Sequence, residues 1–79
     1  MPTLLQQDGF RFFFYSNDHD PPHVHVEYGT GSAKVDLMPT IALINSRNMG
    51  KKEIKKMLNI ITKHHAEFLD AWKHFFNQN

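Results

Sequence analysis

The chain has 79 residues, a formal net charge of +1 and no cysteine. A chain of this length forms a single domain, 1–79, with a small core. Without cysteine it has neither disulfides nor thiolate metal sites, and no stretch of about 18 apolar residues predicts a membrane span. The amino terminus lacks the pattern of a secretory signal. These features predict a soluble, cytoplasmic protein with no membrane partner.

The first predicted element is a β-hairpin. An Asp-Gly pair at 8–9 separates two apolar stretches, and it favours a type I′ turn between strands over about 2–7 and 10–15. Alternation gives the second strand two faces, one with Phe10, Phe12 and Phe14 and one with Arg11, Phe13 and Tyr15. Because both faces carry aromatic rings, we expect Phe13 and Tyr15 either to cover a second core or to form an exposed platform.

A proline-rich loop leads into a strand that carries two histidines. Residues 16–22 are rich in Ser, Asn, Asp and Pro, which favour turns over regular pairing. Strands are predicted over about 23–28 and 32–37, on either side of a glycine-rich turn. Alternation along the first of them turns Val24, Val26 and Tyr28 to one face and His23, His25 and Glu27 to the other. The valines indicate the core face, and the histidines indicate an exposed candidate site.

The turn between these two strands allows two registers. A type II′ loop at 29–30 sets His25 opposite Lys34, whereas a loop at 30–31 sets Glu27 opposite Lys34. Residues paired across a hairpin share a face of the sheet. Either register therefore keeps these side chains on one face together with Asp36.

The second half of the chain predicts a helix. Residues 41–44 are apolar and predict a short edge strand or a packed loop. A helical pattern follows and predicts a helix over 51–76, either continuous or broken near 64–65. Its apolar stripe consists of Ile54, Met57, Leu58, Ile61, His65, Phe68, Leu69, Trp72, Phe75 and Phe76. The last three residues, 77–79, are expected to form a frayed tail.

Together these elements predict an α+β fold. An antiparallel sheet of four strands, or of five if 41–44 forms one, is built from two hairpins and packs against one long or broken C-terminal helix. The chain has seven Phe, two Tyr and one Trp. One small core does not readily bury so much aromatic surface, so we expect a homo- or hetero-oligomer.

The outward histidine face predicts acid/base chemistry on RNA. Histidine titrates near neutrality, so His23 and His25 are candidates for the general acid and base, with Glu27 as an orienting or basic carboxylate. Cations stabilise charge on a phosphate, and exposed rings stack on bases. The candidate substrate-binding residues are Arg11, Lys34 and Arg47 for phosphate and Tyr15 for a base. This set suits metal-independent cleavage, in which the base activates the ribose 2′-hydroxyl, and it needs no cofactor.

Two other interpretations of the histidines remain open. Alternate residues of a strand place His23 and His25 on one side, and His19 or Asp20 from the loop is a candidate third ligand for zinc, nickel or iron. In the other interpretation, the histidines only hydrogen-bond carboxylates such as Asp36. His-x-His spacing alone does not distinguish these cases.

A basic segment opens the predicted helix. It contains Arg47, Lys51, Lys52, Lys55, Lys56 and Lys63. Cations near a helix N-terminus oppose the helix dipole and indicate a phosphate site. Exposed lysines also serve simply to keep a helix face soluble. The segment therefore predicts either contact with phosphate or an acidic protein, or only a solvated surface.

The order of these motifs resembles one bacterial family. The segments that carry the resemblance are 1–3, 8–17, 22–27, 33–34 and 71–72. Together they are similar to the domain of unknown function 4160 over nearly the whole chain. The resemblance implies a small cytoplasmic α+β protein, encoded beside a second small protein as a component of a toxin–antitoxin system. The family signature falls on the outward set of Arg11, His23, His25, Glu27 and Lys34.

The resemblance leaves three functional hypotheses. The first is a toxin–antitoxin component whose histidine face binds or cleaves RNA, as a metal-independent ribonuclease if it is an enzyme. The second is a non-enzymatic module that binds its cognate small protein, an antitoxin or a toxin, through the aromatic sheet or the helix stripe. The third is a metal-binding domain that uses His19, His23 and His25.

Overall fold

The computed structural model describes residues 3–76, which form five strands and two helices. The elements are β1 (Thr3–Gln7), β2 (Phe10–Phe13), β3 (His23–Tyr28), β4 (Gly31–Asp36), β5 (Ala42–Arg47), α1 (Lys51–Lys63) and α2 (His65–Phe76). The first residue of the expected strand 2–7 and the expected tail at 77–79 lie outside the described residues. Between residues 3 and 76, no helix is long and apolar enough to cross a membrane.

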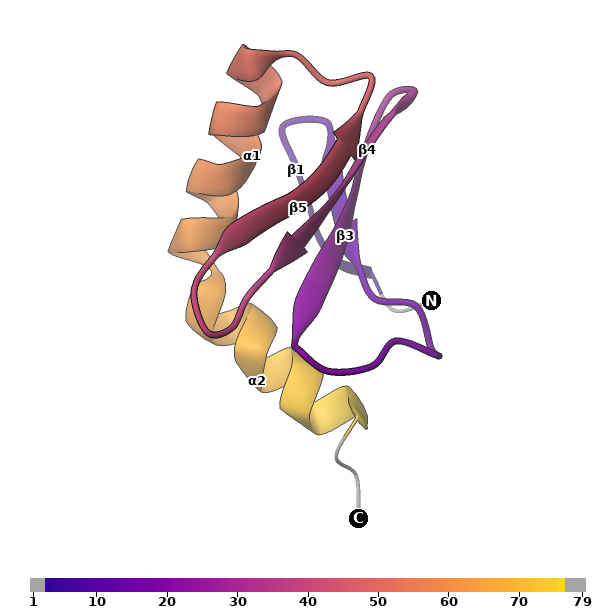
Figure 1. Cartoon of the computed structure of the whole chain (residues 1–79), viewed down its shortest axis with the longest axis vertical. Coiled ribbons are helices and arrows are strands. Elements are labelled where there is room, and N and C mark those ends of the chain that lie inside the picture. Colours follow the sequence, from indigo (N-terminus) through magenta and orange to yellow (C-terminus); the bar gives the residue numbers. More distant parts are fainter. Residues whose placement is uncertain (1–2, 77–79) are drawn as a thin grey trace.

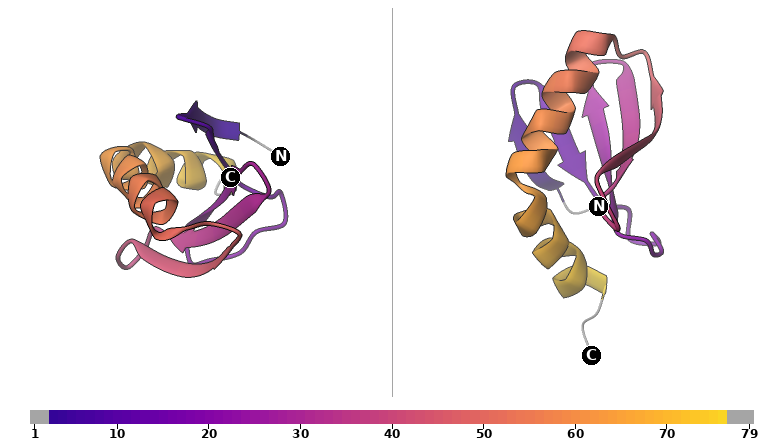
Figure 2. Two further views of the ribbon diagram at one scale, coloured as in Figure 1. Left: turned by 90° about the horizontal axis from the view of Figure 1, so that it is seen from above. Right: turned by 60° about the vertical axis from the view of Figure 1, so that its left-hand side comes forward.

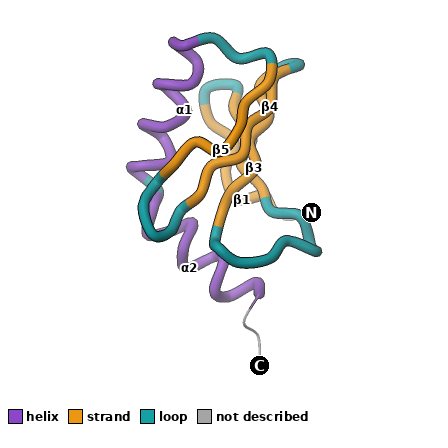
Figure 3. Tube along the Cα trace, viewed as in Figure 1, coloured by secondary structure: helices purple, strands orange, loops and turns teal. Residues whose placement is uncertain are grey.

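The five strands form one antiparallel sheet in the order β1-β2-β3-β4-β5 (Figure 1). The expectation of an α+β fold with an antiparallel sheet is confirmed. The description as two hairpins is imprecise, because β2 also pairs with β3, so that the chain runs as one continuous meander. A long loop over 14–22 makes this central connection, and it is the long teal segment that leads into β3 in Figure 3.

The turn residues set the register of both tight hairpins. Asp8 and Gly9 have φ values of 54° and 87°, as the two central residues of a type I′ turn require. Between β3 and β4, His25 lies opposite Lys34 and the loop is 29–30, with φ 57° at Gly29. The first of the two predicted registers is therefore the observed one.

The fifth strand exists and is longer than expected. β5 spans Ala42–Arg47 and pairs with β4, with an irregularity between Lys34 and Val35. The four-stranded version of the prediction is therefore wrong, and residues 42–44 of the apolar segment form only the first half of the strand. Its polar half escapes a hydrophobicity pattern because an edge strand with an exposed face tolerates polar side chains.

Both helices lie on one side of the curved sheet (Figure 2). The sheet turns every second side chain toward them, as the alternation of Phe10, Phe12 and Phe14 predicts. The buried core formed in this way contains Phe10, Phe12, Phe14, Val24, Val26, Ala33, Val35, Leu37, Met57, Ile60, Ile61, Phe68 and Trp72. The opposite face of the sheet is left open for the candidate site.

The helical segment is broken at His64, so the continuous helix over 51–76 is wrong and the broken alternative is confirmed. The His64 amide still donates to the carbonyl of Ile60 at 3.1 Å, and its own carbonyl accepts from Phe68 at 2.9 Å. The next residue, His65, donates its Nε2–H to the Leu37 carbonyl oxygen at 2.8 Å. This bond anchors the break to the end of β4, and it explains why a histidine lies in the apolar stripe.

The position of the core predicts a contrast between two isoleucines. Ile61 is 0% exposed beneath the sheet, whereas Ile44 is 49% exposed on β5. Ile61→Ala removes buried methylenes, so we expect it to lower the free energy of unfolding by about 2–5 kcal/mol. Ile44→Ala should lower it by less than about 1 kcal/mol. Urea denaturation followed by circular dichroism measures both, and equal losses would contradict this packing.

Candidate functional site

The open face of the sheet carries a hollow of about 210 Å³. We call it the sheet pocket, and its lining residues are Phe13, Tyr15, His25, Val26, Glu27, Ser32, Ala33, Lys34 and Asn45. Strand pairing brings its centre together, because His25 lies opposite Phe13 on one side and Lys34 on the other. The predicted residues Tyr15, His25, Glu27 and Lys34 therefore meet at one place.

Phe13 and Tyr15 have different environments within this pocket. Phe13 is buried, with the Arg11 guanidinium 4.3 Å from its ring centroid and the rings of Tyr15 and His25 at 5.2 and 5.6 Å. Tyr15 is 40% exposed. Of the two predicted alternatives, Phe13 thus covers a second small core, whereas Tyr15 forms an exposed platform.

Arg11 and Glu27 form a pair across β2 and β3. The Arg11 Nη1 lies 2.9 Å from Glu27 Oε1, and the Arg11 Nε donates to Thr3 Oγ1 at 3.1 Å. A partly exposed pair of this kind contributes at most about 1 kcal/mol. Its main effect is to hold the guanidinium over Phe13. The positive charge of Arg11 is already paired with the Glu27 carboxylate.

His23 does not lie on the surface as expected. Its side chain shares the outward direction of His25, but the residue is only 4% exposed. The ring lies 5.1 Å from the ring of Trp72 on α2, and it meets the His25 ring edge-on at 5.0 Å. The start of β3 is thus covered by α2 and by the loop 14–22. Strand alternation takes neither of them into account.

The loop also brings Asp18 against both histidines. The Asp18 carboxylate accepts a hydrogen bond from the Tyr15 amide through Oδ2 at 2.8 Å, and the Asp18 amide donates to the Tyr15 carbonyl at 3.2 Å. His25 Nε2 lies 3.1 Å from Asp18 Oδ1, and His23 Nε2 lies 3.2 Å from the same oxygen. We call Asp18, His23 and His25 the Asp-His-His cluster.

The surroundings of Asp18 keep it ionised. Burial raises the pKa of its carboxyl group, but the hydrogen bonds from the Tyr15 amide and His25 and the nearby charges of His25 and His23 outweigh this effect. The net result is a pKa below the ordinary value for aspartate. The cluster therefore presents a carboxylate together with two imidazoles.

The remaining predicted residues contribute no ligand atom to this cluster. His19 lines a separate hollow of about 300 Å³ with Asp18, Asp20, Trp72 and Phe76. Its ring nitrogens are not among the ligand atoms that lie within 4.8 Å of one another in the cluster. Asp36 lies opposite His23 in the strand register, but the His23 ring contacts Asp18 and the Pro21 carbonyl instead. Arg47 is exposed and lies opposite Ser32, outside the lining of the sheet pocket.

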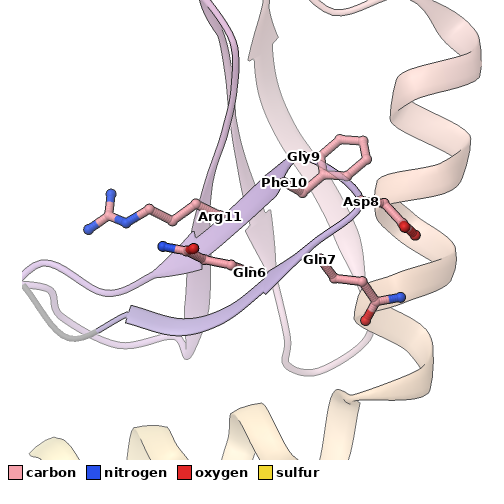
Figure 4. Close-up of a pocket in the computed structure, with 6 residues that line it drawn as sticks. All are labelled: Gln6, Gln7, Asp8, Gly9, Phe10 and Arg11. Atoms are coloured by element: carbon pink, nitrogen blue, oxygen red, sulfur yellow. The ribbon is translucent and has the colours of Figure 1, made fainter.

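A third hollow offers few ionisable side chains. It measures about 340 Å³ and is lined by the first hairpin, through Gln6, Gln7, Asp8, Gly9, Phe10 and Arg11. Figure 4 shows Phe10 and Arg11 pointing to opposite sides of β2. The only ionisable residues in this lining are Asp8 and Arg11, and the Arg11 guanidinium is paired with Glu27. The sheet pocket and the Asp-His-His cluster are the better candidates.

The lowered pKa of Asp18 predicts how stability depends on pH. Because the folded state holds the carboxylate more strongly than the unfolded state, Asp18 stabilises the fold above the ordinary aspartate pKa of about 3.9, and this contribution is lost as the pH falls through the folded pKa. Asp18→Asn removes this dependence. In metal-free buffer, denaturation should show wild type more stable than Asp18→Asn at pH 6, with the difference narrowing below about pH 4. A constant difference across this range would contradict the assignment.

Of the comparisons with known proteins, only the one with models of protein families gave a match. Neither a search of curated proteins nor a search of solved structures found a match. The model of one protein family, described as domain of unknown function (DUF4160), matches residues 9–73. The matched segment includes the sheet pocket from Phe13 to Asn45 and all three residues of the Asp-His-His cluster. The chain therefore belongs to the DUF4160 family.

Proposed function

We propose that this protein is a toxin–antitoxin component that binds single-stranded RNA on the open face of its sheet. The observation that carries the proposal is the sheet pocket itself. Beside buried Phe13 and the Glu27 carboxylate, it combines a cation, an amide, an imidazole and an exposed aromatic ring. Positively charged grooves and stacking rings are the features by which sheet proteins hold single strands. The toxin–antitoxin part rests on the family resemblance described above.

Each polar residue of the pocket has a role in this proposal. The Lys34 ammonium contacts a phosphate, and within residues 3–76 Lys34 has no ion-pair partner. Tyr15 offers its exposed ring for stacking on a base. The Asn45 amide both donates and accepts hydrogen bonds, as the edge of a base or a ribose hydroxyl requires.

The burial of His23 favours binding over cleavage by two histidines. A general acid and a general base must both reach the scissile phosphodiester. His25 lines the pocket, but His23 is absent from the lining, and its two ring nitrogens face the Pro21 carbonyl and Asp18. We therefore assign the face to RNA binding. The cognate partner protein and the oligomeric state stay predictions.

Binding of a labelled RNA tests the role of Lys34. Wild type should bind a fluorescein-labelled single-stranded 12-mer of mixed sequence in a salt-dependent manner. Lys34→Gln should weaken binding about threefold to tenfold and reduce the salt dependence, and Tyr15→Leu should weaken it through lost stacking. Fluorescence anisotropy measures the affinities. Lys73→Gln is the matched control, because Lys73 is exposed on α2, outside the basic segment and the sheet pocket. Equal effects of the two lysine variants, or no binding by wild type, would overturn the proposal.

Growth on induced expression tests the biological role. Because RNA binding by a toxin interferes with translation or RNA stability, we expect wild type to arrest growth of a bacterial host that lacks the partner, and Lys34→Gln to relieve the arrest. Colony counts after induction measure the effect, and immunoblotting confirms equal soluble expression. Continued growth with soluble wild type would argue against a toxic role and in favour of the neutralising member of the pair.

A further inference from the structure

The Asp-His-His cluster has the composition of a metal site. One ligand atom from each of Asp18, His23 and His25 lies within 4.8 Å of the other two. The three side chains are 10, 6 and 17% exposed, respectively. Two imidazoles and a carboxylate are thus gathered in a largely buried place, where a structure must compensate the carboxylate charge.

The hydrogen bonding of His23 leaves its Nε2 atom facing Asp18, where a proton or a metal ion can lie between them. His23 Nδ1 lies 2.8 Å from the carbonyl oxygen of Pro21, and a carbonyl only accepts hydrogen bonds, so the Nδ1 atom carries the proton. In neutral histidine the Nε2 atom then has a lone pair and no hydrogen. This atom lies 3.2 Å from Asp18 Oδ1. Two electron-rich atoms in contact repel each other unless a proton or a metal ion lies between them.

The distances fit a metal as well as a proton. Zinc binds histidine nitrogen and carboxylate oxygen at about 2.0–2.2 Å, so neighbouring ligands of a tetrahedral site lie about 3.4 Å apart. Asp18 Oδ1 lies 3.2 Å from His23 Nε2 and 3.1 Å from His25 Nε2. The two histidine nitrogens lie within 4.8 Å of each other, so adjustment of the side chains would bring all three ligand atoms to the spacing of such a site.

The groups behind the three ligands also match a metal site. Histidine ligands usually donate their second ring N–H to a backbone carbonyl or carboxylate, which fixes the ring. His23 does so through Pro21. The Tyr15 amide donates to Asp18 Oδ2 at 2.8 Å. This oxygen also lies 3.2 Å from His25 Nε2, and Oδ1 is the oxygen that contacts both histidines. The backbone of the loop therefore orients two of the three ligands.

We propose that Asp18, His23 and His25 bind one divalent transition-metal ion, with zinc as the best fit and a fourth position open to water. Imidazole ligands favour zinc, nickel, cobalt or copper over magnesium and calcium, which take oxygen ligands. The loop contributes Asp18 in place of the His19 expected from the sequence. His25 belongs to both the sheet pocket and the metal site, but the Lys34 ammonium and the Tyr15 ring supply no ligand atom, so metal binding is testable without RNA.

Metal titration of the untagged, chelator-treated protein tests this site. At pH 7.5, isothermal titration calorimetry with zinc chloride should show one ion per chain with a Kd below about 10 μM. Cobalt(II) should give the visible absorption bands of a tetrahedral site. The single tryptophan, Trp72, lies 5.1 Å from the His23 ring, so copper(II) should quench its fluorescence at the same stoichiometry. These readouts require no assumed activity.

Matched variants locate the bound ion. His25→Gln and Asp18→Asn should each weaken zinc binding at least about tenfold, as loss of a ligand does. His19→Gln and His74→Gln, which change exposed histidines outside the cluster, should bind as wild type does, and so should Lys34→Gln. Circular dichroism confirms that each variant is folded. No stoichiometric binding by folded wild type at about 100 μM zinc, or equal weakening by His25→Gln and His19→Gln, would overturn the proposal.

Discussion

Alternation along β2 and β3 assigns every second side chain to the helix-covered core and leaves the others on the open face. Phe12 and Val26 are opposite each other within the core, and one step along the same pairing Phe13 lies opposite His25. A slip of one residue would exchange the two sets. Burial of the core side chains therefore also fixes where the aromatic and imidazole groups of the candidate site lie.

The loop between β2 and β3 adds what alternation does not provide. Its reciprocal bonds between Tyr15 and Asp18 fold the loop back, so that a carboxylate reaches the outward histidines at the start of β3. Bonds of this kind join residues three apart in the sequence, so they are local and need few residues. The three ligands therefore come from one short part of the chain. The strand supplies two histidines, and the turn before it supplies one carboxylate.

The sequence predicts the features that arise from local rules and misses those that arise from tertiary contact. The type I′ turn and the alternation on β3 follow from turn chemistry and periodicity, whereas the length of the helical segment left a continuous and a broken helix as alternatives. The polar end of β5 follows from neither rule, because pairing with β4 stabilises it despite its composition. Asp18 was missed for a related reason: in the sequence it is one of several turn-forming residues, and only the folded loop distinguishes it from its neighbour His19.

His23 connects the candidate site to the packing of α2. One side of its ring faces Trp72, which is buried in the main core, and its Nε2 atom faces Asp18. A proton or ion held between His23 and Asp18 therefore acts on a ring that also supports α2. Since a ligand that binds only the folded state stabilises that state, occupancy of the cluster would favour docking of α2 as well as closure of the loop. The site and the final helix thus belong to one packing unit, although strand alternation places His23 on the opposite face from the core.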